Sequence, residues 1–183
     1  MNDVLKTIAD RNSCRNFSPE PITEAQVSAL VDAALAAPSA MNRQPWHIIA
    51  ITNKPLIDEM DRYAMEGIKT GNPDAYQRMM DRGGTIFYNA PCLLVIAKDD
   101  TDYATLDAGI VSQNIALAAH SLGLGSVICG MARMPLNGEK GEAFKKRINF
   151  PEGYTFGMAV CVGTAITGKA PHELDYSKVT HIK

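Results

Sequence analysis

Residues 92–122 read CLLVIAKDDTDYATLDAGIVSQNIALAAHSL, and this stretch decides the fold class. Its first part, residues 92–98, is apolar up to Lys98, which predicts a strand buried on both faces of a sheet. An acidic turn follows, and residues 104–122 then form the most apolar helical pattern of the chain, which Gly123 ends. A buried strand joined to a buried helix predicts layers of secondary structure around one sheet.

The flanking sequence supplies further elements of both kinds. Thr23 and Gln26 form a capping box, which predicts that a helix begins there and runs until Pro38 stops it. The other expected helices cover residues 3–10, residues 54–82 with a break at Gly71-Asn72-Pro73, and residues 139–147; the other expected strands cover residues 47–52, 126–130 and 155–163. We therefore expect an α+β fold with one domain over residues 1–183, whose polar tail spans residues 168–183.

Composition narrows the classes of function. The chain has 183 residues and a formal net charge of -2, which argues against a basic nucleic-acid-binding surface. No apolar run reaches the roughly 18–20 residues of a membrane span, and residues 1–8 lack the apolar core of a signal peptide. Its four cysteines form no C-x-x-C pair and are expected to be free thiols. We expect a cytoplasmic protein without nucleic-acid or membrane partners.

Several common catalytic motifs are absent or incomplete. The glycines from Gly123 to Gly130 lie between a helix and a strand, which is the reverse of the order that a dinucleotide fingerprint requires. The stretch from Gly163 resembles a phosphate loop, but Ala170 replaces its Ser or Thr, so Lys169 remains only as a lone phosphate contact. No histidine has a partner at metal-ligand spacing, and no Gly-x-Ser-x-Gly occurs, so we expect no metal site and favour chemistry carried by a cofactor.

Three segments are unusual enough to be candidate binding sites. In an extended chain Arg11, Ser13 and Arg15 project from one face, and two guanidiniums with a hydroxyl suit a phosphate dianion. A helix end stabilised by nearby cations explains the same residues equally well. In the Pro38–Trp46 loop, side-chain amides suit the edge of a heterocycle, although a plain connecting loop is the alternative. The small residues of Gly125–Gly130 allow a flat ligand to approach, although a core strand explains them better.

Taken in order, these segments resemble the nitroreductase family of FMN-dependent oxidoreductases. The matching motifs are Arg11-x-Ser13-x-Arg15-x-Phe17 with Pro21-Ile22, Ala37-Pro38-Ser39-Ala40-Met41-Asn42-Arg43-Gln44-Pro45-Trp46, Phe87-Tyr88-Asn89-Ala90-Pro91, and Gly123-Leu124-Gly125-Ser126. The resemblance covers nearly the whole chain, and residues 54–82 and the tail match least. It implies a nitroreductase-like fold: a central, mostly antiparallel sheet flanked by helices, in a domain-swapped homodimer that buries FMN at its interface.

The resemblance also implies a set of cofactor-binding residues and no catalytic side chain, because the flavin carries the hydride. Arg11, Ser13 and Arg15 would hold the phosphate and ribityl region, with Lys169 as a further cation. The expected contacts of the isoalloxazine ring and the ribityl chain are Pro38, Ser39, Ala40, Asn42 and Gln44, and those beside the ring, with a backbone N–H near the flavin nitrogen, are Ile128, Cys129 and Gly130.

The implied function is NAD(P)H oxidation by an FMN-dependent enzyme with ping-pong turnover, in which a nitroaromatic or quinone is the small-molecule acceptor. One alternative keeps the fold but changes the reaction to dehalogenation, enoate reduction or flavin breakdown, and another is a non-catalytic flavin-binding redox sensor. The methionine-rich residues 54–82 are expected to form either a variable helical cover over the acceptor or ordinary core packing.

Overall fold

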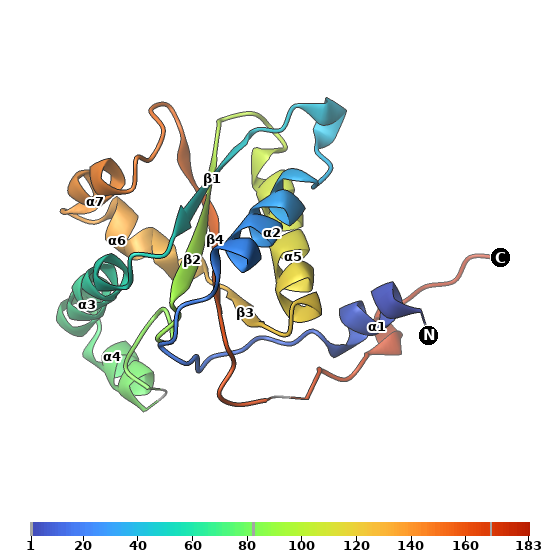
Figure 1. Cartoon of the computed structure of the whole chain (residues 1–183), viewed down its shortest axis with the longest axis horizontal. Coiled ribbons are helices and arrows are strands. Elements are labelled where there is room, and N and C mark those ends of the chain that lie inside the picture. The colour runs from blue at the N-terminus through green and yellow to red at the C-terminus, as the bar shows by residue number, and fades with distance from the viewer. Residues whose placement is uncertain (1, 82, 169) are drawn as a thin grey trace.

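A four-stranded antiparallel sheet lies between two groups of helices (Figure 1). The computed structural model describes residues 2–81, 83–168 and 170–183. The strand order is β1-β2-β4-β3, so β3 lies at one edge of the sheet. The strands are β1 (Trp46–Ile51), β2 (Cys92–Lys98), β3 (Gly125–Ile128) and β4 (Thr155–Gly163). The expected α+β fold with an antiparallel sheet is therefore confirmed.

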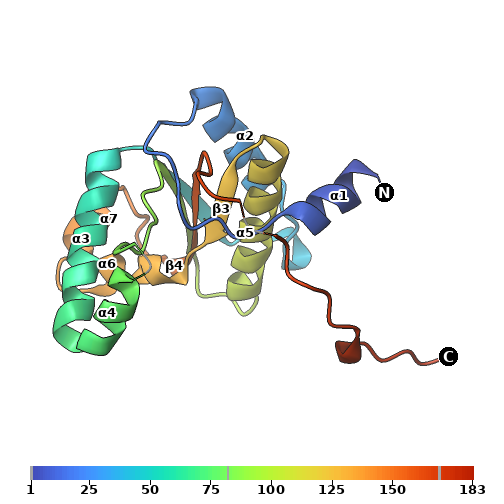
Figure 2. The same cartoon turned by 90° about the horizontal axis from the view of Figure 1, so that it is seen from below.

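Both faces of the sheet are covered, and β2 shows why its sequence is uniformly apolar. Leu93 and Val95 belong to one buried cluster, whereas Leu94 and Ile96 belong to the other, as the alternation of a strand requires. One face carries α2 (Glu24–Leu35) and α5 (Ala104–Ser121) (Figure 2). The opposite face carries α3 (Lys54–Gly71), α4 (Pro73–Met80), α6 (Arg133–Asn137) and α7 (Gly141–Arg147).

The helix boundaries follow local sequence signals. The capping box at Thr23 is present, with the Gln26 N–H donating to the Thr23 Oγ1 at 3.2 Å. The expected break between α3 and α4 is confirmed, and Asn72 caps α4 through its side chain. Met60 and Met65 on α3 are only 0% and 7% exposed, so these two methionines pack into the core.

Other details differ from the sequence expectations. A short 3-10 turn, η2 (Gly130–Ala132), and the five-residue α6 follow β3, which ends at Ile128 instead of residue 130. The sequence analysis does not predict α6, because a single helical turn that contains Pro135 is too short for a periodic pattern. At the chain ends, α1 (Asp3–Asp10) has no buried residue, and residues 170–183 are exposed, with one 3-10 turn, η3 (Tyr176–Lys178).

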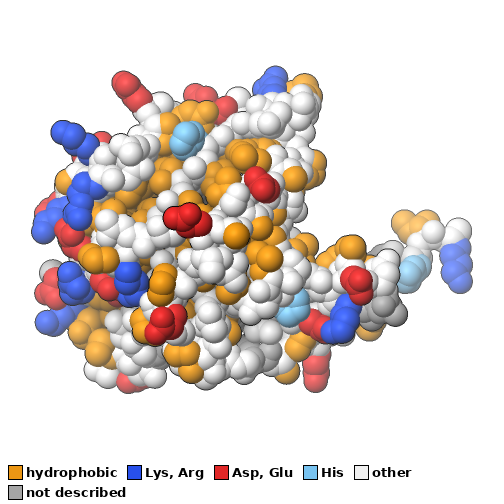
Figure 3. Space-filling model, viewed as in Figure 1, with side chains coloured by type: hydrophobic (Ala, Val, Ile, Leu, Met, Phe, Trp, Pro, Cys, Tyr) orange, Lys and Arg blue, Asp and Glu red, His pale blue; other side chains and the backbone are white. Residues whose placement is uncertain are grey.

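Charged side chains of both signs are interspersed on the surface over α3 and α7 (Figure 3). Several of them pair, as Arg147 does with Glu59 at 2.7 Å. Within the described ranges, no helix is long and apolar enough to cross a bilayer.

Candidate functional site

The segment from Arg11 to Phe17 lies against the open edge of the sheet. Ser13 forms a parallel bridge with Ser126 of β3, and the Cys14 N–H donates to the Ser126 carbonyl at 2.9 Å. Gly125 allows this approach, because a Cβ at that position would lie only 2.9 Å from the Cβ of Cys14. The edge strand therefore fixes the position of the expected phosphate-binding residues.

The extended backbone sorts these side chains onto two faces. Cys14 is 5% exposed and packs into the core, whereas its neighbours on the other face point outward. Arg11, Ser13 and Arg15 line one hollow of about 260 Å³, which the tail residues Ala170–His172 also border. The structure thus brings together the three residues that the spacing predicted, while Lys169 lies outside the described residues.

The chemistry of this hollow fits a phosphate. The lining contains two guanidiniums, the Ser13 hydroxyl and the Asn12 amide, and none of its residues is acidic. Arginine stays charged at all relevant pH values and offers a fork of donors that matches phosphate oxygens. Such a donor set attracts and orients a dianion without any protonation change of the protein. We name this feature the arginine hollow.

Tyr88 also borders the site, although the sequence predicted no binding role for it and showed it only within the Phe87–Pro91 motif. It occupies a turn in which Tyr88 and Asn89 have φ values of 57° and 62°, in the left-handed region that most side chains avoid. The carboxylate of Asp61 holds the turn by accepting hydrogen bonds from the Thr85 hydroxyl at 2.7 Å and the Ile86 N–H at 2.8 Å. The Tyr88 carbonyl then accepts the Phe17 N–H at 3.2 Å, which ties the turn to the arginine segment.

The Tyr88 side chain lies beside Arg15, and both residues line a smaller hollow of about 200 Å³. Burial raises the pKa of the Tyr88 hydroxyl, and the nearby Cys129 adds to this effect, while the Arg15 guanidinium opposes it. The hydroxyl therefore remains protonated at neutral pH and is available as a neutral hydrogen-bond donor or acceptor next to the arginine hollow.

The end of β3 turns a backbone N–H toward the open edge of the sheet. The Cys129 N–H donates to the Ala159 carbonyl at 2.7 Å, so the alternation of an antiparallel ladder turns the N–H of Ile128 away from β4. Ile128 is 40% exposed. Cys129, by contrast, points inward, and its thiol donates to the Ile86 carbonyl at 3.4 Å. Of the three residues expected beside the ring, Ile128 and Gly130 are thus exposed and Cys129 is buried.

The Cys129 thiol also lies next to Cys161 of β4. A hydrogen bond between the two thiols, together with complete burial, raises the pKa of Cys161 well above its ordinary value. Cys161 is therefore a neutral thiol at physiological pH. This pair belongs to the core beneath the site.

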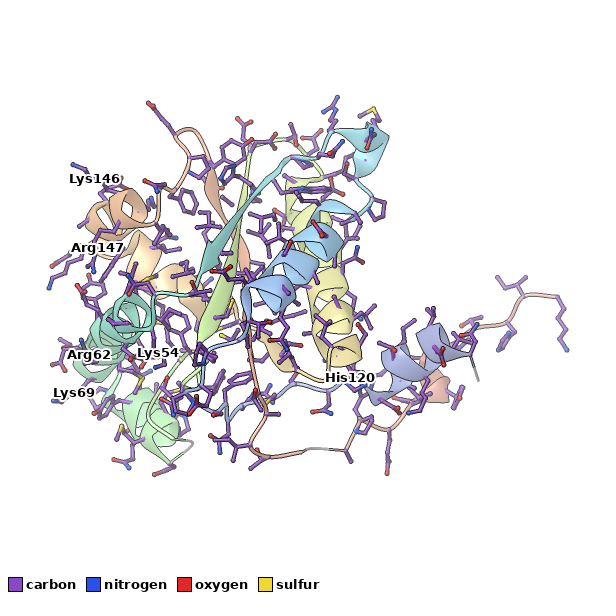
Figure 4. The ribbon with its side chains drawn as sticks, in the orientation of Figure 1. Lys54, Arg62, Lys69, His120, Lys146 and Arg147 are labelled. Atoms are coloured by element: carbon purple, nitrogen blue, oxygen red, sulfur yellow. The ribbon has the colours of Figure 1, made fainter. Side chains whose placement is uncertain are left out.

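The loop with Pro38, Ser39, Ala40, Asn42 and Gln44 lies elsewhere in the chain. Its Ala40 N–H faces Asp107 near the start of α5, at the top of Figure 1, whereas the arginine segment runs along the bottom. His120, labelled at the other end of α5 in Figure 4, borders a hollow together with Arg11. At 1.5 Å per residue, the helix separates these two ends by about 20 Å. One copy of the chain therefore does not bring all the expected residues together.

The molecule is an α+β domain with a hollow lined by two arginines and a serine, and the edge of its sheet lies beside that hollow. The comparison with protein families then gives the identification, since the Nitroreductase family model matches residues 8–164. The chain belongs to the nitroreductase family, and the resemblance found in its motifs is confirmed.

Individual relatives agree with this assignment. The crystal structure of a nitroreductase with bound FMN from Desulfitobacterium hafniense is 43% identical, with a TM-score of 0.95 over 100% of both chains. An FMN-dependent nitroreductase from Clostridium difficile is 26% identical, with a TM-score of 0.85 over 99% of both chains. A candidate NADH dehydrogenase/NAD(P)H nitroreductase from Methanothermobacter thermautotrophicus is 30% identical over 82% of this chain and 71% of its own length.

Proposed function

We propose that this protein is an FMN-dependent NAD(P)H oxidoreductase that reduces small acceptors such as nitroaromatics or quinones. The observation that carries the proposal is the arginine hollow, which lies at the sheet edge two residues along the strand from Ile128. At about 3.3 Å per residue, the arginine hollow and the Ile128 N–H that points away from β4 are separated by a distance that a ribityl chain can span. The relatives named above as FMN-bound or FMN-dependent support the choice of cofactor.

When bound, FMN would accept a hydride from a reduced nicotinamide and pass electrons to an acceptor. The protein's own contribution is then binding and orientation. Arg11, Ser13 and Arg15 hold the phosphate, and the exposed backbone of Ile128 and Gly130 lies beside the ring. The nicotinamide and the acceptor use the same space in turn, so turnover is ping-pong. No side chain is required as a general acid or base.

We infer that a second copy of the chain completes the site. The loop of residues 38–44 lies at the opposite end of α5 from the arginine hollow (Figure 1). Val4 and Leu5 on α1 are 67% and 54% exposed, and Tyr176 in the tail is 77% exposed, which suits surfaces that a partner covers. A symmetric homodimer supplies the loop of one copy to the hollow of the other.

An anaerobic reduction experiment tests the function. We expect the purified protein to carry a yellow cofactor, identified as FMN by mass after release, and we expect NADH or NADPH to bleach it at a catalytically useful rate. Reoxidation by a nitroaromatic or quinone then identifies the acceptor class. Slow bleaching would favour a non-catalytic flavin-binding protein, and a colourless protein that does not bind added FMN would contradict the proposal. Light scattering should give about twice the 19.8 kDa chain mass.

A further inference from the structure

Asp107 is a carboxylate buried on α5, at 2% exposure. Its two oxygens each lie 3.4 Å from the same donor, the N–H of Ala40. Among the residues that the structure describes, no lysine, arginine or histidine nitrogen lies within 4.0 Å of it. The carboxylate therefore has one long, shared backbone contact, and it lies in the first turn of α5, near the positive end of the helix dipole.

This arrangement does not serve stability well. A carboxylate loses its hydration on burial, and the single N–H that the two oxygens share lies 3.4 Å from each, which is long for a hydrogen bond. An apolar side chain of similar volume often stabilises a protein at such a place. The carboxylate instead accepts a hydrogen bond from the Ala40 N–H in the loop of residues 38–44, and an apolar side chain cannot make this contact.

That loop has an unusual backbone that needs external support. Met41, Asn42 and Gln44 have φ values of 54°, 53° and 49°, in the left-handed region. Each such non-glycine residue stores strain that persists only where the surroundings impose the conformation. Within the loop, the Ser39 hydroxyl accepts the Gln44 N–H at 2.9 Å, and the Ser39 carbonyl accepts the Asn42 N–H at 3.0 Å. Asp107 adds the one side-chain hydrogen bond that ties the loop to the helix layer among the described residues.

We propose that Asp107 is a positioning residue that holds the loop of residues 38–44 in its flavin-binding conformation by accepting the Ala40 N–H. The inference rests on the proposed function, because it assigns the loop to the ring end of FMN. Loss of Asp107 weakens contacts to the isoalloxazine ring, whereas loss of an arginine weakens contacts to the phosphate.

The test compares Asp107→Leu with Ser112→Ala by titrating FMN, riboflavin and lumiflavin into the flavin-free full-length protein. Ser112 is a matched control, since it is 0% exposed on the same helix and its hydroxyl donates within that helix to the Ala108 carbonyl at 2.7 Å. We expect Asp107→Leu to weaken all three flavins by about tenfold, near the lower limit for a hydrogen bond to a charged group, and Ser112→Ala to leave all three unchanged. Asp107→Asn, whose amide oxygen can still accept the Ala40 N–H, should retain most of the affinity.

Two further readouts separate positioning from general destabilisation. Hydrogen exchange at residues 39–44 should quicken in flavin-free Asp107→Leu, while the melting temperature stays near that of the wild type. Unchanged affinity in both Asp107 variants, a loss confined to FMN, or a loss that appears only together with dimer dissociation would overturn the inference. Failure of the wild type to bind any flavin would instead overturn the proposed function, so the two results are distinguishable.

Discussion

Replacing Arg11 by alanine gives the sharpest test of the arginine hollow. Arg11 is half-buried, and its backbone closes α1 by donating its N–H to the Thr7 carbonyl at 3.0 Å. That backbone contact survives the substitution, so only the guanidinium is lost. A hydrogen bond to a charged group contributes about 1.5–3 kcal/mol, which corresponds to a loss of FMN affinity of about 10- to 200-fold. Arg15 is exposed, so its replacement should cost less, on the order of 1 kcal/mol.

The assay is a fluorescence titration of flavin-free protein with FMN and with riboflavin, which lacks the phosphate. Wild type should bind riboflavin weakly, and Arg11→Ala should leave that weak binding almost unchanged. Higher salt should reduce the FMN affinity of the wild type more than that of the variant, because the variant has one charge fewer that salt can screen from the phosphate. Arg62→Ala is the matched control, since Arg62 lies on α3 at a distance from the hollow (Figure 4).

Equal losses for FMN and riboflavin would contradict a phosphate contact of Arg11, because such a contact cannot affect a ligand without phosphate. An equal loss of FMN affinity in Arg62→Ala and Arg11→Ala would also contradict the contact, because non-specific attraction between the anion and positive charge would explain both losses.

The remaining predictions concern Tyr88, packing and the α3–α4 segment. Folding raises the pKa of Tyr88 above 10.0, so the neutral hydroxyl's contribution to the free energy of unfolding is present below pH 10 and is lost as the pH rises through the folded-state pKa. Chemical denaturation should therefore show that the wild type loses more stability in that pH range than Tyr88→Phe does. A Cβ at Gly163 would lie 2.5 Å from the Pro91 Cδ, so Gly163→Ala should lower the free energy of unfolding by about 1–3 kcal/mol. A Cβ at Gly67 on α3 would have no atom within 4 Å, so Gly67→Ala should raise the free energy of unfolding by about 0.5–1 kcal/mol in the same assay. Met65→Ala should lower the free energy of unfolding by about 2–5 kcal/mol and leave the ratio of kcat/KM between two acceptors unchanged. Tyr76 lies on the half-buried face of α4, and Tyr76→Ala should change that ratio; an unchanged ratio would contradict a role of α4 in acceptor choice.

The sequence was sufficient for the elements whose signals are local. The uniform apolarity of residues 92–98 predicted β2, and the capping box at Thr23 and the break at Gly71–Pro73 placed three helix ends. The spacing of Arg11, Ser13 and Arg15 predicted a shared face, because side chains of an extended backbone alternate. By contrast, α6 was missed, since a single helical turn has too few residues to show a period.

The way these segments combine into a site depends on the packing of segments that are distant in the sequence. Asp61 and Thr85 are separated from Arg15 by long stretches of sequence, yet their turn places Tyr88 beside that arginine. The burial of Met65 depends on what packs against α3, which composition cannot specify. The length of α5 separates the loop of residues 38–44 from the arginine hollow. Local patterns determine helices, strands and the faces of side chains, because they depend on neighbours in the chain, whereas contacts between distant segments depend on packing of the whole sheet and its helices.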